Sequence, residues 1–181
     1  MNNETRQILE AVQSGNMSVD DALLKLKMEP YTDIGFAKVD NHRKIRQGIP
    51  EVIYGAGKTA EQITGIVDIM KKNGQKQILI TRISFDTAES INKTHSLTYY
   101  EDAGIGLIGE IPNPDGIGNI VVATAGTSDI PVAEEASLTA EALGNAVTRI
   151  YDVGVAGLHR LLAHKEELMS ASVIIAIAGM E

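Results

Sequence analysis

The fold is decided by residues 119–131, which read NIVVATAGTSDIP. Residues 119–124 have a strongly apolar centre, as in a strand that is buried on both faces of a parallel sheet. Gly126 ends the apolar run, and Pro131 suits the first turn of a helix that we expect to continue to Leu143. A buried strand, a short polar loop and a helix in this order form the repeating unit of an α/β protein.

The same order of strand, loop and helix extends outward from this stretch in both directions. The pattern predicts helices at about 58–73, 86–93, 130–143 and 158–169. Apolar strands that alternate with helices indicate a mainly parallel sheet with helices on both faces, and ligands bind such sheets beyond the carboxyl ends of the strands. The predicted strands are residues 51–54, 77–83, 97–101, 104–111, 119–124, 147–155 and 172–178.

The first fifty residues are predicted to lie outside this α/β domain, which covers 51–181. Apolar spacing and helix-start signals predict two short helices, one near 5–14 and one from Ser18 to Pro30, which form an N-terminal helical segment over 1–30. Residues 31–50 show little periodicity and are interpreted as a linker. Its cationic cluster at 40–48 is either a solvated surface segment or an arm that contacts an anion.

Composition and charge exclude several classes of protein. The net charge of −8 argues against a nucleic-acid partner, and the longest apolar run is too short for a membrane span, which needs ~20 residues. The polar start does not resemble a signal peptide, so we expect a cytoplasmic protein. The 181 residues contain no cysteine, which excludes thiolate chemistry within them, and the four scattered histidines show no metal-ligand spacing.

Two glycine-rich stretches resemble nucleotide-binding motifs without matching their requirements. Residues 55–59 resemble the end of a P-loop, but Val52 stands where the motif needs a glycine, so a triphosphatase is not expected. Lys58 either contacts one phosphate or carboxylate, or is a surface lysine in a turn. Residues 104–109 match GxGxxG, yet Pro112 follows at once, so they suit a strand rather than the start of a helix.

The loop at 126–129 is a stronger candidate for an anion site. Gly126 allows close approach to the backbone, and the hydroxyls of Thr127 and Ser128 are donors at a helix start that favours phosphate. Asp129 would repel phosphate, so it is expected to face sugar hydroxyls or a metal. The alternative is an ordinary helix cap formed by Ser128 or Asp129.

These residues also carry a family resemblance. Residues 126–136 resemble the signature of the aminoimidazole ribonucleotide carboxylase (PurE-like) superfamily, Gly-Ser-x-Ser-Asp-x-Pro, with Thr127 in place of a serine. Further stretches resemble one branch of it, the pyridinium-3,5-biscarboxylic acid mononucleotide synthase (LarB) family. They are residues 40–47, 48–59, 152–160 and 178–181, so the resemblance spans almost the whole chain.

The resemblance implies a three-layer α/β/α fold, a homo-oligomer that is an octamer in full-length relatives, and use of a divalent cation such as Mg²⁺. It implies carboxylation of the pyridinium ring of nicotinic acid adenine dinucleotide, or an NAD-like nucleotide, by CO2 or bicarbonate. Hydrolysis of the phosphoanhydride then releases AMP. The product feeds synthesis of the nickel-pincer nucleotide cofactor of lactate racemase.

The resemblance also implies roles for individual residues. Ser128 and Asp129 are expected to contact the ribose phosphate, with backbone donors from Gly126 and Thr127. Glu181 is expected to activate water or hold the metal, whose other ligands are unknown. The roles of His159 and Arg160 stay open. The further substrate-binding candidates, mostly cations that would neutralise phosphates or the ring carboxylate, are Asp40, Arg43, Arg46 and Lys58.

One departure from the family bears on activity. The family uses a cysteine thiolate to make the pyridinium ring nucleophilic, and these residues include none. The last predicted strand also lacks a covering helix, so we expect the chain to be an N-terminal fragment. Two alternatives remain: a purine-pathway carboxylase or mutase, which needs a histidine where Met180 and Glu181 stand, and a non-catalytic nucleotide-binding or assembly module.

Overall fold

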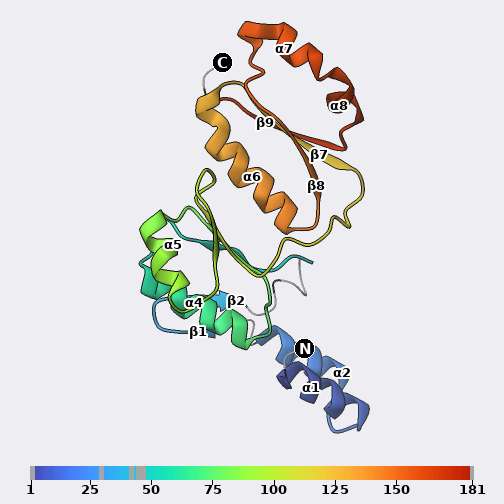
Figure 1. Ribbon diagram of the computed structural model, residues 1–181. Coiled ribbons are helices and arrows are strands. Elements are labelled where there is room, and N and C mark those ends of the chain that lie inside the picture. The colour runs from blue at the N-terminus through green and yellow to red at the C-terminus, as the bar shows by residue number, and fades with distance from the viewer. Residues whose placement is uncertain (1–2, 29–30, 41–42, 44–47, 180–181) are drawn as a thin grey trace.

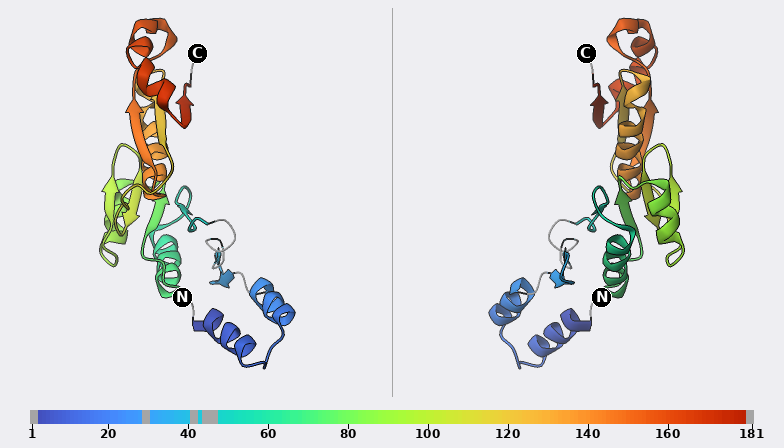
Figure 2. Two further views of the ribbon diagram at one scale, coloured as in Figure 1. Left: turned by 90° about the vertical axis from the view of Figure 1, so that its right-hand side faces the viewer. Right: turned by 90° about the vertical axis from the view of Figure 1, so that its left-hand side faces the viewer.

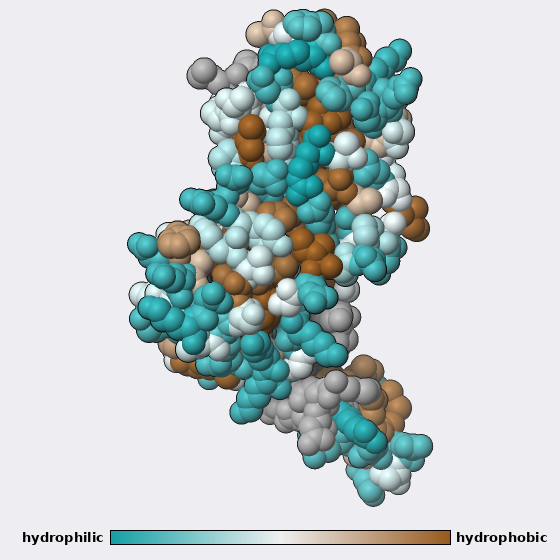
Figure 3. All heavy atoms as spheres, viewed as in Figure 1, coloured by the Kyte–Doolittle hydropathy of each residue, from teal (hydrophilic) through white to brown (hydrophobic). Residues whose placement is uncertain are grey.

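The structure is a computed structural model that describes residues 3–28, 31–40, 43 and 48–179. It is elongated, with a pair of N-terminal helices at one end and the C-terminus near the other (Figure 1). Hydrophilic side chains dominate the face shown in Figure 3, and hydrophobic ones appear in separate patches along its middle. Among the described residues, no helix is long and apolar enough to cross a membrane.

The two predicted N-terminal helices are present as α1 (Asn3–Gln13) and α2 (Val19–Met28). Ser18 caps α2, because its Oγ accepts a hydrogen bond from the Asp21 N–H at 3.0 Å. The pair projects from the rest of the molecule (Figure 2), and Leu23 and Leu24 of α2 are about half exposed. It therefore forms only a small core of its own.

The predicted linker contains regular structure that the sequence analysis missed. Strands β1 (Tyr31–Asp33) and β2 (Lys38–Asp40) form an antiparallel hairpin. Gly35 adopts φ +84° in the connecting turn, and its N–H donates to Asp33 Oδ1 at 2.8 Å. Strands of three residues are too short to show a period of two, so only the turn residues signalled the hairpin.

The first sheet has the strand order β3 (Ile53–Tyr54), β4 (Ile78–Thr81), β6 (Ile105–Ile108) and β5 (Thr98–Tyr100). Strands β3 and β4 are parallel, and the other pairings are antiparallel. The helices α4 (Ala60–Lys72) and α5 (Phe85–Asn92) pack their apolar sides on this sheet. A capping box between Thr59 and Gln62 begins α4, close to the predicted start of this helix at residue 58.

The GxGxxG stretch is a strand, as expected, and not a cofactor loop. Residues 105–108 form β6, and a Cβ added at Gly106 would lie 2.8 Å from both Ile83 Cδ1 and Leu97 Cδ1. Close packing of side chains therefore explains the glycine at position 106 without a dinucleotide.

The second sheet is fully parallel, with the order β8 (Ala146–Ile150), β7 (Asn119–Thr124) and β9 (Val173–Ile177). The helices α7 (Leu158–Ala163) and α8 (Lys165–Ser170) lie against it, and a break at His164 divides the single helix predicted there. Strand β9 was predicted to be buried, but it is an edge strand. Val173 and Ile174 are about half exposed, and β7 is the described strand that pairs with β9.

Helix α6 (Ile130–Ala142) connects the two sheets. Leu138 and Ala142 pack on Leu79 and Leu107 of the first sheet, while α6 also contacts β7 and β8 of the second. Buried residues on several sides of α6 explain how one helix covers two sheets. The predicted α/β class is confirmed, and the strands predicted for one mainly parallel sheet are divided between a mixed sheet and a parallel one.

Candidate functional site

The candidate site lies where the carboxyl ends of β7, β8 and β9 meet, near the C-terminus in Figure 1. Backbone hydrogen bonds join the loops that follow these strands. The Ala125 N–H donates to Ile177 O at 3.0 Å, and the Gly154 N–H donates to Ala125 O at 2.9 Å. Ligands bind open parallel sheets at this edge, so the topology places the loop at 126–129 where a ligand is expected.

Asp129 fixes the loop between β7 and α6. Its Oδ2 accepts a hydrogen bond from the Gly126 N–H at 3.1 Å, and its Oδ1 accepts one from the Gly179 N–H at 3.2 Å. Both carboxylate oxygens are thus engaged by backbone donors. Asp129 therefore positions the loop, and its expected contact with sugar hydroxyls or a metal stays a prediction.

Thr127 and Ser128 are exposed on the short 3-10 turn η1 (Thr127–Asp129), which leads directly into α6. Asp129 stands at the cap position of α6 and makes no side-chain capping bond to that helix, but its carboxylate accepts the Gly126 N–H as in a capping box for η1. The first turn of a helix also leaves backbone N–H groups without intrahelical partners. The turn therefore presents two hydroxyls beside a helix N-terminus that favours anions.

Gly126 is not required by the fold. Its backbone is extended, with φ −123° and ψ 170°, and a Cβ added there would lie no closer than 3.8 Å to Asp129 Oδ2. Any residue adopts this conformation, and 3.8 Å is an ordinary contact. A ligand that approaches the backbone closely would account for the glycine.

Asp152 and Arg160 lie at the same edge, and Asp152 was missed as a site residue. Asp152 has φ +58°, which is uncommon for a residue other than glycine, and its N–H donates to Thr124 Oγ1 at 3.0 Å. Its carboxylate forms an ion pair with Arg160 at the start of α7. The spacing within residues 152–160 carried the family resemblance but gave no sign of this pair.

A half-buried network holds α6 against β8 beneath the site. The Arg149 guanidinium binds Glu141 through two hydrogen bonds of 2.6 and 2.9 Å and reaches Glu134 at 3.2 Å. The hydrogen bonds that Arg149 donates to Glu141 are the main reason that the pKa of Arg149 is raised. Tyr151 donates to Glu134 at 2.7 Å, and burial followed by this hydrogen bond raises the pKa of Tyr151.

Lys58 lies at a different edge, at the carboxyl end of β3 in the first sheet. The Lys58 N–H donates to Gly55 O at 3.0 Å, which closes a tight turn, and its ammonium donates to Tyr54 O at 2.6 Å. A Cβ at Gly55 would lie 2.4 Å from Ile83 Cγ2. Packing explains this glycine, so the turn is no phosphate-cradling loop.

Asp40 and Arg43 lie near Glu51, at the start of the first sheet. Glu51 Oε2 accepts a hydrogen bond from the Asp40 N–H at 2.7 Å. Burial raises the pKa of Glu51, with the Asp40 hydrogen bond and the charge of Arg43 acting in the opposite direction. Arg46 and Glu181 lie outside the described residues. No group of three or more potential metal ligands occurs within the part of the chain that the structure describes.

Comparison with known proteins gives two matches. A model of the LarB/PurE-like N-terminal domain matches residues 31–110, which hold the β1–β2 hairpin and the first sheet. An uncharacterized protein of Methanocaldococcus jannaschii is 36% identical over 191 aligned positions, which cover 100% of this chain and 74% of that protein. The second match extends over the loop at 126–129, which lies outside the first.

Proposed function

The chain belongs to the LarB/PurE-like family, a superfamily of carboxylase and mutase type, and we propose on this basis that it binds nicotinic acid adenine dinucleotide for carboxylation. The full reaction replaces the ring C–H by a carboxylate from CO2 and releases a proton. Cleavage of the phosphoanhydride consumes one water and releases AMP. The carboxylated mononucleotide would serve synthesis of the nickel-pincer cofactor.

The observation that carries the proposal is the conformation of the loop at 126–129, which Asp129 fixes. Two backbone N–H groups fix the Asp129 carboxylate, while Thr127 and Ser128 stay exposed at the start of α6. We assign the phosphate of the nicotinate mononucleotide half to these hydroxyls, beside the N-terminus of α6, where the helix dipole favours an anion. Gly126, which the fold does not need, allows this approach.

We assign Arg160 as a cation that supports that phosphate. Its guanidinium lies at the same edge of the sheet, and Asp152 holds it through an ion pair. A guanidinium offers five donors in a fixed fork, so Arg160 retains donors for a phosphate while it binds Asp152. The open role of Arg160 becomes substrate binding in this proposal.

We assign binding, and not the covalent step, to these 181 residues. A pyridinium ring is electron-poor and needs a nucleophile before it can attack CO2. The family's thiolate has no counterpart here, because the sequence contains no cysteine. The divalent cation that the family uses remains part of the family-based proposal, and no step is assigned to it. A homo-oligomer and the role of Glu181 remain part of the family-based proposal.

The proposal is tested by assay of the chain with nicotinic acid adenine dinucleotide and ¹³C-bicarbonate, with chromatography for AMP and mass spectrometry for the carboxylated ring. AMP release with ¹³C incorporation would support the complete reaction. Binding without AMP release would favour the nucleotide-binding module, which the absence of cysteine supports. Preference for aminoimidazole ribonucleotide over the dinucleotide would favour the purine-pathway alternative.

A further inference from the structure

Tyr54, Lys58 and Arg82 form a cluster at the carboxyl ends of β3 and β4. The Arg82 Cζ lies 5.5 Å from the centre of the Tyr54 ring, and the Lys58 Nζ lies 5.9 Å from it. Strands β3 and β4 are the parallel pair of the first sheet, so the cluster stands where ligands bind such pairs. We propose that these three side chains bind the phosphate group of a phosphate ester.

The cluster has an excess of positive charge. Arg82 is paired with Glu135 of α6, whose two carboxylate oxygens lie 3.1 and 3.2 Å from the Arg82 Nε. The Lys58 ammonium donates to Tyr54 O, a neutral carbonyl, at 2.6 Å. One of the two cations thus lacks a carboxylate partner among the described residues. An anionic ligand would supply the missing negative charge.

Donor groups remain available in the cluster. The Arg82 guanidinium uses Nε on Glu135 and brings Nη1 to 3.5 Å from the Tyr54 hydroxyl, which leaves further N–H groups. The Tyr54 hydroxyl accepts that contact and keeps its own proton for donation. Lys58 carries three N–H donors and directs one at Tyr54 O. Each of the three side chains therefore keeps a donor for a phosphate oxygen.

The backbone at Arg82 is strained. Arg82 has φ +56°, a left-handed conformation that costs energy for any residue with a Cβ. Its side chain is 54% exposed, so no buried packing demands an arginine here. Strained residues that are not required by packing cluster at binding sites, where the strain directs a side chain. At this position the backbone turns the guanidinium toward Tyr54 and Glu135.

The phosphate has two sources that share this chemistry, free phosphate and the phosphate of a nucleotide such as AMP. The Tyr54 side chain is 52% exposed, and its ring offers a surface beside the two cations. A nucleoside attached to the phosphate gains contact with that ring. We therefore expect AMP to bind more tightly than inorganic phosphate, with the two competing for the same residues.

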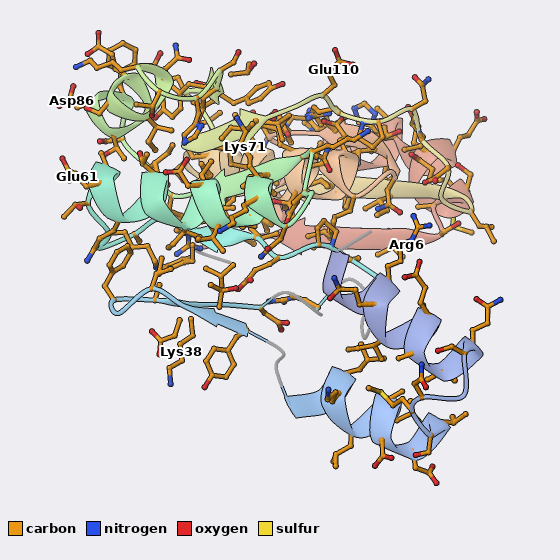
Figure 4. The ribbon with its side chains drawn as sticks, turned by 90° about the horizontal axis from the view of Figure 1, so that it is seen from below. Arg6, Lys38, Glu61, Lys71, Asp86 and Glu110 are labelled. Atoms are coloured by element: carbon orange, nitrogen blue, oxygen red, sulfur yellow. The ribbon has the colours of Figure 1, made fainter. Side chains whose placement is uncertain are left out.

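Calorimetric titration of the full chain with AMP and with inorganic phosphate, in a phosphate-free buffer at low salt, tests the proposal. Arg82→Gly and Lys58→Gln are each expected to raise the Kd for AMP at least tenfold. Glycine adopts the left-handed backbone of position 82 without strain, so Arg82→Gly should keep the fold. An unchanged melting temperature would verify this. Lys38→Gln is the matched control, because Lys38 also lies over a tyrosine ring, Tyr31, at 5.1 Å, and belongs to the hairpin (Figure 4).

Unchanged AMP binding in both cluster variants, or no binding of either ligand by the unaltered chain, would overturn the proposal. The proposal would also be overturned if Lys38→Gln weakened AMP binding as much as the cluster variants do, because this would show a general effect of charge. Tyr54 and Arg82 play no part in the proposed function, whereas Lys58 is also a substrate-binding candidate of the family resemblance. The test here measures binding of AMP and phosphate, and not of the dinucleotide. Failure to bind the dinucleotide would contradict the proposed function and leave the phosphate site intact.

Discussion

Asp129 and Gly179 stand fifty positions apart in the chain, and the Gly179 N–H donates a hydrogen bond to Asp129 Oδ1 at 3.2 Å. The other oxygen of the same carboxylate accepts the Gly126 N–H at 3.1 Å. One side chain thereby ties the loop before α6 to the loop after β9. The exposed hydroxyls of Thr127 and Ser128 owe their position to this bridge.

Asp129→Asn should destabilise the chain. The asparagine amide nitrogen would face a backbone N–H where a carboxylate oxygen now accepts, so one donor loses its partner at a cost of about 1–3 kcal/mol. Urea unfolding followed by circular dichroism measures the loss. Asp102→Asn is the control, because Asp102 is exposed in the turn before β6 and should change little. Equal stability of both variants would contradict the bridge.

Gly126→Ala should leave stability almost unchanged and weaken nucleotide binding. The added methyl group meets nothing closer than 3.8 Å, and the backbone is already extended. The same methyl group lies on the surface that we assign to the phosphate. Parallel measurements of the urea midpoint and of dinucleotide affinity separate the two effects, and a large loss of stability would show that the glycine serves the fold.

Gly106→Ala should lower stability and leave nucleotide binding unchanged. The new methyl group would lie 2.8 Å from Ile83 and Leu97 in a buried strand, so we expect a loss of about 1–3 kcal/mol from overpacking. Nucleotide binding measured well below the melting temperature should be retained. Loss of binding with normal stability would instead restore the dinucleotide interpretation of residues 104–109.

Arg149→Lys should lower stability by about 1–2 kcal/mol although the charge is kept. Arg149 binds Glu141 with two parallel hydrogen bonds and reaches Glu134 as well, and an ammonium cannot reproduce that fork. Thermal unfolding of the variant measures the loss. Arg6→Lys serves as control, because Arg6 pairs with Glu10 on an exposed helix surface and should change stability little.

Glu51→Gln should stabilise the chain at pH 7 and lose this advantage in acid. Burial raises the pKa of Glu51 in the folded state, so folding favours the protonated carboxyl. The free energy that protonated Glu51 contributes to folding is present at pH values below its pKa in the unfolded chain. It is lost as pH rises through its pKa in the folded chain. Glutamine mimics the neutral form and still accepts the Asp40 N–H. Urea midpoints of both proteins from pH 7 to pH 4 should converge as pH falls.

The sequence predicted well those elements whose signals are local. Helix α4 begins after Thr59 and ends before Asn73, close to the limits predicted from these residues. Strand β7 has the predicted limits of 119–124, because its apolar centre lies between polar ends. The break at His164 and the short strands of the β1–β2 hairpin left no periodic signal. The exposure of β9 was missed because an apolar edge strand and an apolar central strand look alike.

Contacts between distant residues were beyond prediction from one sequence. The loop at 126–129 was found from its glycine, its hydroxyls and its place between strand and helix. The bond between Asp129 and Gly179 depends on β7 and β9 being neighbours, which no local pattern states. Arg82 and Tyr54 gave no sequence signal either, because the left-handed backbone of Arg82 appears only in three dimensions.

The central claim is that the loop at 126–129 binds the pyridinium nucleotide. Calorimetric titration of nicotinic acid adenine dinucleotide into the unaltered chain and into Gly126→Ala tests it most directly. We predict saturable one-to-one binding by the unaltered chain and at least tenfold weaker binding by a variant of equal stability. Equal affinity of the two proteins, or no binding by the unaltered chain, would contradict the claim.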